Sequence, residues 1–441
     1  MGIRVVDKVR DDRDIFRRIF EENWSGFKAS YPKYNTEYYE EVVQKMLCCG
    51  KEEGGYAEYF CTYCHATQRI AFTCKSSFCL SCAKVYTDNF VSQVSKTLQP
   101  GLKYRHMILT VPEQLRESFY RNRKEGELLS ALMRCGYACL ESVVSTATGK
   151  QVKIGAIVVV QTHGRSGKYN PHLHVIMSSG GINEKSGKWV ELGYFPYKII
   201  HRKWQYYLFK MMKEIVGTQE MRGLIDKLWK EYPRGLVAHV TKGKVPERFR
   251  GLAKYLAKYV ASPPIAVSRI ISYEDNKVTY WYKEHETKKK EVVTVYVYTF
   301  LGRMVQHILP KGFQRIRYYG LQATRTFKKW CEAIKEGLRK IGRHIRGVYE
   351  VVARKNYRER YKEMSGKDPL MCKNCGREMD LWEIWHPKYG TIFDEYENLK
   401  SGRSGEIIHE KEEEPEGDRG RGYSLWPPAG GVQLSLFPLW I

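Results

Sequence analysis

Two histidines in the segment Pro-His-Leu-His-Val-Ile-Met, His172 and His174, have the spacing of a metal-binding pair on a β-strand. Residues two apart in a strand project from the same face, so both imidazoles can bind one divalent cation while Leu173 points into the core. A third ligand has to come from the neighbouring strand, where Gln161 and His163 are both well placed. Histidines that merely satisfy hydrogen bonds within a sheet are the alternative interpretation.

Two tyrosines in Lys-Tyr-Leu-Ala-Lys-Tyr-Val-Ala, Tyr255 and Tyr259, lie four residues apart and are therefore neighbours on one helix face. Lys254 and Lys258 flank them as candidate DNA contacts. A tyrosine can attack a scissile phosphate and store the phosphodiester's energy as phosphotyrosine, provided that a cation withdraws charge from the phosphate. Because the same spacing recurs elsewhere in this tyrosine-rich chain, the pair is also compatible with simple packing.

Two C-x2-C pairs near the N-terminus have the spacing of a four-thiolate zinc site, with the ligands Cys61, Cys64, Cys79 and Cys82. Four thiolates leave no open coordination position, so this zinc is predicted to be structural and its module to grip DNA rather than to cut it. Cys74, together with Cys48 or Cys49 and with His65 as a further candidate, has the residue types for a second zinc. Near the C-terminus, Cys372 and Cys375 form a lone pair that lacks a second C-x2-C nearby.

The composition indicates a polyanionic partner. The chain of 441 residues has 74 Lys and Arg against 49 Asp and Glu, a formal charge of +25, and its 32 tyrosines and 10 tryptophans suit unstacked bases. No apolar run of membrane-spanning length and no secretory signal are expected, which predicts a cytoplasmic, nucleoid-associated protein with no membrane partner. In a reducing compartment, clustered cysteines indicate metal ligands rather than disulfides.

The elements that must position these groups can be read from residue patterns. Ile154–Gln161 and Pro171–Ser178 are β-branched runs separated by a Gly, Ser and Asn-rich turn, which is typical of a β-hairpin. The tyrosines fall on a predicted helix over 247–260. A basic helical stretch is expected over 324–364, and the remainder is expected to be loosely organised.

Six segments, in this order along the chain, resemble the two-tyrosine HUH transposases of insertion-sequence family ninety-one, which work by a rolling-circle route. The first resembles that family's zinc-binding domain, the next three its opening strand, metal-binding hairpin and tyrosine helix, and the last two the block behind the active site. The segments are Phe72–Cys82, Ile108–Pro112, the hairpin parts Gln161–Gly164 and Asn170–Val175, Lys254–Ala261, Ser268–Ile270 with the hairpin after it, and Leu309–Gly320.

The resemblance implies an α+β fold: a central antiparallel sheet with the histidine strand near its centre, helices that include a tyrosine helix beneath the metal, and a small N-terminal zinc-binding module. It implies single-stranded DNA as substrate and Mg or Mn as the working ion, although imidazoles also bind zinc or nickel. By resemblance, His172 and His174 are metal ligands and Tyr255 and Tyr259 are nucleophiles. Gln161 is the preferred third ligand because the family has glutamine there; His163 departs from the family pattern and leaves that choice open.

The expected organisation follows from these segments. It comprises N-terminal helices (1–47), a zinc-binding domain (48–97), an HUH nuclease (98–320), a basic helical segment (321–370), a zinc knuckle (371–390) and a flexible tail (391–441). The tail ends in a stretch similar to the peptide by which bacterial replication proteins bind the sliding clamp, with the contact residues Gln433, Leu434, Leu436 and Phe437. Packing of these apolar residues against the body is the alternative.

The function predicted from these features is DNA transposition, a form of DNA recombination. A transposase of this kind nicks one strand at the element's end, becomes linked to a 5′ phosphate through tyrosine and frees a 3′ hydroxyl. Two alternatives stay open. A rolling-circle replication initiator or relaxase would share the chemistry, and a non-catalytic, zinc-containing nucleic-acid-binding protein would use the histidines and tyrosines only for packing.

Overall fold

A computed structural model describes residues 14–99, 101–193, 197–241, 251–252, 254–255, 263–284, 287, 289–340 and 355–402. The chain forms two compact units, of which the first comprises 1–39 and 86–353 and the second 40–85 and 354–441. The second unit is therefore discontinuous in sequence, because the main part of the first unit is inserted into it.

An antiparallel sheet with the strand order β11-β4-β5-β3-β7 forms the centre of the first unit, and β6 pairs with β5 outside this path. The strands are β3 (Tyr104–Thr110), β4 (Val152–His163), β5 (Tyr169–Asn183), β6 (Trp189–Glu191), β7 (Ala238–Val240) and β11 (Ile316–Gly320). The histidine strand β5 is third of five, and β4 and β5 form the predicted hairpin. The expected α+β class with a central antiparallel sheet is confirmed.

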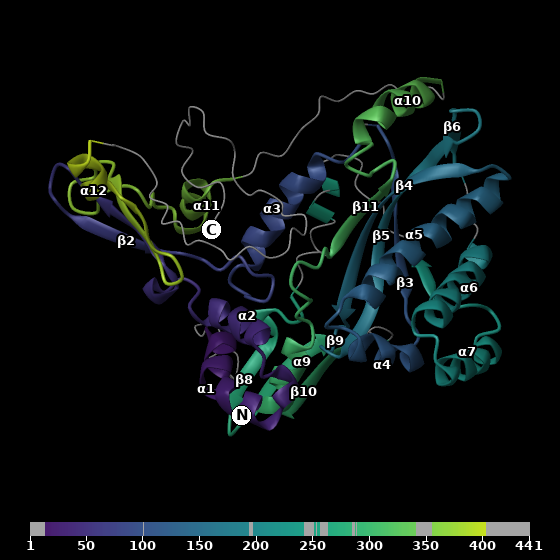
Figure 1. Cartoon of the computed structure of the whole chain (residues 1–441), viewed down its shortest axis with the longest axis horizontal. Helices are drawn as coiled ribbons and strands as arrows, with labels where there is room; N and C mark the ends of the chain where they lie inside the picture. Colours follow the sequence, from purple (N-terminus) through teal and green to yellow (C-terminus); the bar gives the residue numbers. More distant parts are fainter. Residues whose placement is uncertain are drawn as a thin grey trace, which may run out of the picture. The chain divides into compact units, whose positions relative to one another are not determined.

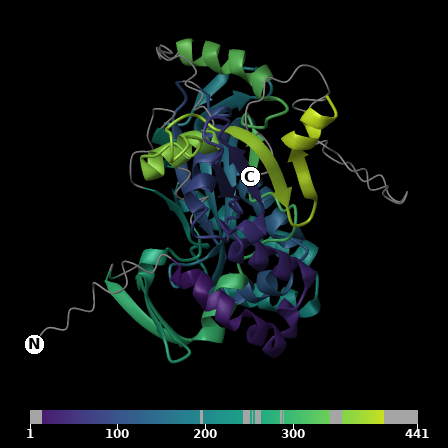
Figure 2. The same cartoon turned by 90° about the vertical axis from the view of Figure 1, so that its left-hand side faces the viewer.

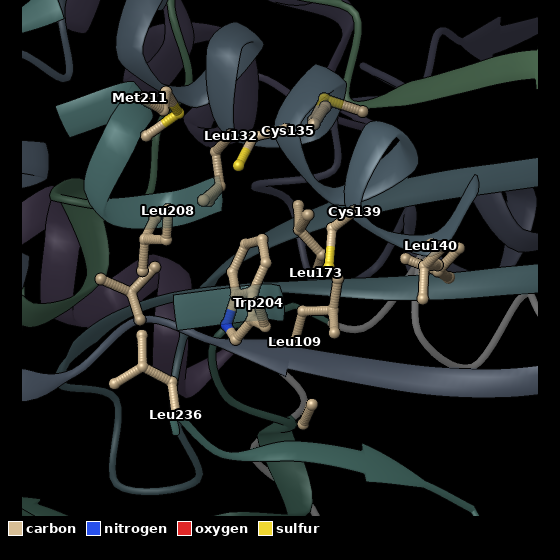
Figure 3. Packing of buried hydrophobic residues seen from close by; sticks show 14 of the residues in the cluster. Leu109, Leu132, Cys135, Cys139, Leu140, Leu173, Trp204, Leu208, Met211 and Leu236 are labelled. Atoms are coloured by element: carbon tan, nitrogen blue, oxygen red, sulfur yellow. The ribbon is translucent and has the colours of Figure 1, made fainter. Parts of the chain in front are cut away.

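One face of this sheet is covered by helices, and Figure 1 shows α5, α6 and α7 on the same side of it. The helices are α4 (Glu113–Arg121), α5 (Glu127–Thr148), α6 (Tyr197–Ile215) and α7 (Gln219–Glu231). Leu109 of β3 and Leu173 of β5 lie near Cys139 of α5 and Trp204 of α6 in the buried cluster (Figure 3). The indole Nε1 of Trp204 also donates to the carbonyl oxygen of Thr110 at 2.8 Å. This core packs the helix-facing side of β3 and β5 against α5 and α6.

Helix α5 is long and apolar enough, by length and composition, to cross a membrane, although no such segment was expected. It is the core helix of the first unit, since 61% of its apolar window is buried and it packs on the sheet. Gly136 allows the close approach: a Cβ at this position would collide with the Leu173 side chain. Strand β5, which carries the two histidines, thus packs directly against α5.

The opposite face of the sheet packs against α3 (Ala83–Ser95), which Figure 1 shows on the other side from α5 and α6. Its buried cluster joins residues of α3 and the following turn to alternate residues of β3, β4 and β5, and these are Phe90, Val91, Val94, Leu98, Leu102, Tyr104, Ile157, Val159 and Ile176. Leu252 belongs to the same cluster and Tyr255 packs against it. Because side chains alternate along a strand, this is also the face of His172 and His174.

The rest of the first unit contains a three-stranded sheet of order β10-β9-β8, drawn in teal to green in Figure 2. Its elements are β8 (Ile270–Glu274), β9 (Lys277–Lys283), β10 (Lys290–Tyr296), α9 (Val297–Val305) and, at the chain's start, α1 (Ile15–Ser30). Aromatic side chains join these parts, for example Phe300 of α9 against Phe16 of α1 and Tyr280 of β9. Helix α10 (Phe327–Lys340) of the first unit lies in the expected basic stretch. Helix α2 (Glu37–Leu47), most of which belongs to the second unit, follows α1 in the chain, as predicted.

The second unit is built on a four-stranded sheet of order β13-β12-β1-β2. Its elements are β1 (Tyr56–Phe60), β2 (Thr67–Ala71), α11 (Tyr357–Ser365), β12 (Asp380–His386), β13 (Gly390–Asp394) and α12 (Glu395–Lys400). The expectation of a loosely organised C-terminal region is wrong for these residues, because β12 pairs with β1 from the N-terminal part of the chain. Parts of two segments expected as separate modules, β1 and β2 of 48–97 and β12 of 371–390, thus share one sheet, whereas residues 86–97 belong to the first unit.

Candidate active site and metal centres

The histidine pair lies on β5, with its ring nitrogens on the sheet face opposite α5 and α6. His172 is paired with Gln161 of β4 on one side and with Thr110 of β3 on the other. Leu173 points the other way and is fully buried in the core behind the pair. The candidate site therefore lies on one face of three neighbouring strands, β4, β5 and β3.

Three potential metal-ligand atoms lie close together on this face of the sheet. His174 Nε2 lies 3.1 Å from His172 Nε2 and 3.1 Å from Gln161 Oε1. Two ligand atoms that are each about 2.1 Å from one cation are about 3.0 to 3.4 Å apart at octahedral to tetrahedral angles. The spacing of these donors therefore fits ligands that share a cation.

The second nitrogen of each ring has a partner of its own. His172 Nδ1 lies 2.8 Å from the carbonyl oxygen of Asn170, which can only accept, so Nδ1 carries the proton and leaves a lone pair on Nε2. His174 Nδ1 lies 3.0 Å from His106 Nε2. Such outer partners are how proteins orient metal-binding imidazoles.

Burial keeps both imidazoles in the neutral form that a metal ligand needs. Burial lowers the pKa of His174 well below the ordinary value, and the nearby His172 and His106 lower it further. The pKa of His172 is also lowered by burial, and the charges of Arg116 and Arg315 act in the same direction. Both rings can thus offer lone pairs across the neutral pH range.

Tyr255 reaches the same cluster through a residue that the sequence motifs did not reveal. His106 of β3 is almost fully buried, and its Nδ1 lies 2.8 Å from the Tyr255 hydroxyl and 3.0 Å from Thr241 Oγ1. Burial lowers the pKa of His106 to about 4. A hydrogen-bonded chain therefore runs from Tyr255 through His106 to His174. A lone histidine in a strand has no motif, and only the alternation of β3 would have placed it on the face of the pair.

His163, the other candidate for the third ligand, lies beyond an irregularity in the β4–β5 ladder that follows Gln161. Its ring packs edge-on against His307, with ring centroids 5.5 Å apart. His307 in turn lies 3.1 Å from Thr162 Oγ1 and 2.9 Å from the carbonyl oxygen of Gly167. Gln161 Oε1 lies 3.1 Å from His174 Nε2, whereas His163 is near enough to lower the pKa of His174 electrostatically.

Two arginines flank His172. Arg116 Nε donates to the carbonyl oxygen of Val111 at 3.3 Å, and Arg315 Nε donates to that of Val160 at 3.3 Å. Each of these carbonyls lies one residue from a strand neighbour of His172. Two guanidinium groups are therefore anchored on either side of the histidine, where they favour an anionic ligand.

The predicted zinc site is wrong in its grouping. Cys61 and Cys64 do not lie with Cys79 and Cys82; the structure places the two pairs in separate clusters. Each cluster holds two further cysteines from elsewhere in the chain. The first cluster consists of Cys49, Cys74, Cys79 and Cys82, and the second consists of Cys61, Cys64, Cys372 and Cys375. Each C-x2-C pair does contribute to a four-cysteine cluster, as its spacing predicted, but the cysteines that complete each cluster are not the predicted ones.

Both clusters have the dimensions of a tetrathiolate zinc site. In each cluster all four sulfur atoms lie within 4.8 Å of one another. Four sulfurs at about 2.3 Å from a central zinc would be about 3.8 Å apart. The sulfur distances of 3.4 Å for Cys49–Cys82 and 3.7 Å for Cys74–Cys82 are close to that value.

Several predicted site residues lie outside the described residues. They are Tyr259, Lys258 and the tail residues Gln433, Leu434, Leu436 and Phe437. Lys254 is described and is exposed.

Two family models match the chain. A model described as a putative transposase matches residues 155–329, which contain the hairpin and the Tyr255 segment. A second model, described as a transposase zinc-binding domain and named for insertion sequence IS91, matches residues 19–111. The chain belongs to the transposases of insertion-sequence family ninety-one.

The transposase is similar to two curated proteins over most of their length. One is the transposase for insertion sequence element IS801 of Pseudomonas savastanoi pv. phaseolicola, with 27% identity over 353 residues that cover 77% of this chain and 82% of the relative. The other is the putative transposase y4qJ of Sinorhizobium fredii, with 26% identity over 379 residues that cover 82% of this chain and 92% of the relative. No solved structure matches the chain. As a transposase it is a DNA-cleaving and strand-transferring enzyme, and its zinc-binding domain and cysteine clusters indicate structural zinc.

Proposed function

We propose that this transposase nicks and rejoins single-stranded DNA at element ends by a rolling-circle route, through 5′-phosphotyrosine intermediates on Tyr255 and Tyr259. The observation that supports the proposal most is the hydrogen-bonded chain from the Tyr255 hydroxyl through His106 to His174. It joins a nucleophile to the donor cluster on one sheet face. Packing alone would not require a buried histidine to join the two.

The ligands of the working cation in this proposal are His172, His174 and Gln161. Bound Mg or Mn would draw charge from the scissile phosphate and lower the barrier to attack. Gln161 is preferred over His163 because its amide oxygen lies 3.1 Å from His174 Nε2. A glutamine oxygen also suits hard cations such as Mg better than a third imidazole does.

His106 acts as a positioning residue for Tyr255. When His174 offers its Nε2 lone pair to the cation, its Nδ1–H donates to His106 Nε2, and His106 must then carry its own proton on Nδ1. That N–H points at the Tyr255 oxygen and at Thr241 Oγ1. A hydrogen bond donated to the tyrosine oxygen favours the attacking phenolate over the phenol.

Arg116 and Arg315 would hold the DNA phosphate beside His172. Their guanidinium groups are anchored through Nε to backbone carbonyls, and their charges act on His172. Planar guanidinium groups bind phosphate oxygens with two parallel hydrogen bonds. We expect them to fix the in-line orientation of the phosphate, while Lys254 and Lys258 contact neighbouring phosphates.

The covalent step balances without a co-reactant. The Tyr255 oxygen forms a bond to phosphorus as the bond from phosphorus to the 3′ oxygen breaks. The phenol loses one proton and the departing 3′ oxygen gains one, so the products are a 5′-phosphotyrosine and a 3′ hydroxyl. Attack of a 3′ hydroxyl on the phosphotyrosine reverses the step and joins strands, and two tyrosines would allow donor and target strands to be handled in turn.

The test is the formation of a covalent adduct. Full-length transposase is incubated with Mg and 5′- or 3′-labelled single-stranded oligonucleotides of the element's ends, and adducts are separated in denaturing gels. We expect adducts that carry the 3′ label, because tyrosine is linked to the 5′ phosphate of the downstream fragment. Fewer adducts are expected with Tyr255→Phe or Tyr259→Phe, and none with the double variant. Tyr206→Phe, which changes an exposed tyrosine of α6, is the matched control. An adduct that survives in the double variant would place the nucleophile elsewhere.

The same assay separates the alternatives. A non-catalytic nucleic-acid-binding protein would leave every oligonucleotide intact. A replication initiator or relaxase would cut at an origin rather than at element ends, and the matches to transposases do not favour it.

We also propose the bacterial sliding clamp as a partner of the C-terminal tail, through Gln433, Leu434, Leu436 and Phe437. The residue pattern supports this: a glutamine can fix the register while leucine and phenylalanine enter an apolar pocket. Immobilised clamp should retain full-length transposase, and Leu436→Ala with Phe437→Ala should abolish retention. Retention that is unchanged in this variant would remove the clamp as a partner.

A further inference from the structure

The turn at Cys61–Ala66 has a defined pattern of backbone hydrogen bonds. The amide of Cys61 donates to the carbonyl oxygen of Ala66 at 2.9 Å, and the amide of His65 donates back to the carbonyl oxygen of Cys61 at 2.9 Å. His65, directly after the second cysteine, has a φ of 57°, in the left-handed region. This geometry folds a C-x2-C segment into a loop whose two sulfurs face the same point.

The turn at Cys372–Arg377 repeats that pattern position by position. The amide of Cys372 donates to the carbonyl oxygen of Arg377 at 2.7 Å, and the amide of Gly376 donates to the carbonyl oxygen of Cys372 at 2.9 Å. Gly376, directly after Cys375, has a φ of 71° and so corresponds to His65 of the first turn. Two segments from opposite parts of the chain have thus adopted the same metal-binding turn.

The strands place these two turns next to each other. The first turn follows the end of β1, the second precedes β12, and β1 and β12 are antiparallel with Phe60 paired to Asp380. The sulfurs of the two turns interleave, since Cys61 lies 3.5 Å from Cys375 and Cys64 lies 3.4 Å from Cys372. Apolar residues of β1, β2 and β12 and of the segments beside the two turns pack around them in one buried cluster.

The other cysteine pair of the N-terminal region has a different turn. The amide of Cys82 donates to the carbonyl oxygen of Cys79 at 3.2 Å, and the other two cysteines of that cluster interact directly, with the amide of Cys74 donating to Cys49 Sγ at 3.2 Å. That cluster draws all its members from residues 49–82 and is complete without the C-terminal region. The two clusters are therefore separate sites with different construction.

We propose that Cys61, Cys64, Cys372 and Cys375 bind a second structural zinc that joins the N-terminal and C-terminal parts of the second unit. The matched family models end at residues 111 and 329, so two of its four ligands lie outside both of them. The paired sulfurs are 308 and 314 residues apart along the chain. The zinc-binding module of this transposase thus includes residues 370–386, and it is incomplete without them.

Metal content of the full-length protein tests the proposal directly. Purified transposase is dialysed against metal-free buffer, and zinc and iron are counted by elemental analysis. We expect two zinc ions per chain in the natural sequence and one when Cys372→Ser is combined with Cys375→Ser. Cys331→Ser, a half-buried cysteine of α10 outside both clusters, should keep two. One zinc in the natural protein, two in the double variant, or iron in the second cluster would overturn the proposal.

A second variant separates ligation from general misfolding. Cys372→His keeps a metal-binding side chain, since three thiolates and one imidazole also bind zinc in a tetrahedral site. We expect Cys372→His to retain two zinc ions and to keep the amides of β1 and β12 protected from hydrogen exchange, whereas Cys372→Ser loses one zinc and that protection. If the His and Ser variants lose metal equally, Cys372 does not ligate zinc and the proposal fails. These readouts do not involve DNA cleavage, so they stand apart from the proposed nicking chemistry.

Discussion

The histidine cluster and the second cysteine cluster are both sets of converging metal donors, but they are assembled over very different distances in sequence. Gln161 and His174 are 13 residues apart, on adjacent strands of one hairpin. The paired sulfurs of Cys61 and Cys375 are separated by 314 residues. In a hairpin, the backbone hydrogen bonds between two adjacent strands position the metal ligands. Metal ligands from distant segments come together only when the whole unit folds.

The two clusters also differ in the amount of buried apolar core around them. The histidine strand lies between two buried clusters of the first unit, one on each face of the sheet. The buried cluster around the second set of cysteines is small and itself includes Cys61 and Cys372. A small core stabilises little by itself, so metal should contribute much more to the folding of the second unit than to that of the first.

The largest effect on catalysis is expected when the candidate ligands of the histidine cluster are removed. His172→Ala combined with His174→Ala should lower the rate of DNA nicking on the order of 10³-fold or more, because a bound cation supplies several kcal/mol of transition-state stabilisation. Binding of the same oligonucleotide should stay nearly unchanged, since affinity comes mainly from contacts of Lys and Arg to phosphates. Gel shifts and single-turnover nicking measure the two quantities. Full nicking by the double variant would show that the histidines are not ligands.

A strong chelator should act on the two units unequally. Removal of zinc should unfold the second unit, because structural zinc sites in small modules bind with an apparent free energy of about 10–16 kcal/mol that is coupled to folding. Hydrogen exchange should therefore become fast in β1 and β12 and stay slow in β4 and β5. Equal loss of protection in both units would mean that zinc stabilises the whole chain and not the second unit in particular.

A smaller effect is expected from His106, which contacts a proposed ligand rather than the cation. His106→Asn should lower nicking and Mn affinity by about 10- to 100-fold, the usual cost of losing an outer partner of a metal-binding histidine. Mn affinity can be followed by electron paramagnetic resonance without DNA. His386→Asn, which changes a histidine of the second unit, serves as the control. Loss of nicking with unaltered Mn affinity would restrict His106 to the positioning of Tyr255.

The last prediction is that the stability of the first unit depends on pH. Burial lowers the pKa of both His106 and His307 to about 4, well below the ordinary value for histidine. Between pH 6.5 and 4 the unfolded chain binds protons that the folded chain does not, so stability should fall as the pH falls through this range. His307→Gln removes one such group and should weaken this dependence by about 2 to 3 kcal/mol over the range. Urea unfolding followed by tryptophan fluorescence compares the two proteins, and identical dependences would contradict the prediction.

The local part of the candidate site could be predicted from sequence. Alternation in a strand fixes that His172 and His174 share a face and that Leu173 is buried behind them, and the turn between the two β-branched runs places Gln161 opposite. His106 could not be recognised in the same way. It is a single histidine in β3, and its role depends on the pairing of β3 with β5, which no local pattern specifies.

The grouping of the cysteines shows where such reasoning ends. Spacing identifies a C-x2-C pair as half of a zinc site, but it does not say which other pair completes the site. The nearest pair in sequence, Cys79 and Cys82, was the natural partner for Cys61 and Cys64, and it was the wrong one. The strands β12 and β13 were missed for the same reason, because their order comes from pairing with β1 rather than from their own residues.

The discontinuous second unit also bears on how the protein is made. During synthesis Cys61 and Cys64 leave the ribosome early, but their proposed partners follow only after the whole inserted nuclease has been translated. At about 5–20 residues per second, this delay is roughly 15–60 s. Over that interval β1 has no β12 to pair with, and two thiols wait without their final metal. The nascent chain therefore has time to fold its central sheet first, and the zinc-binding module is completed last.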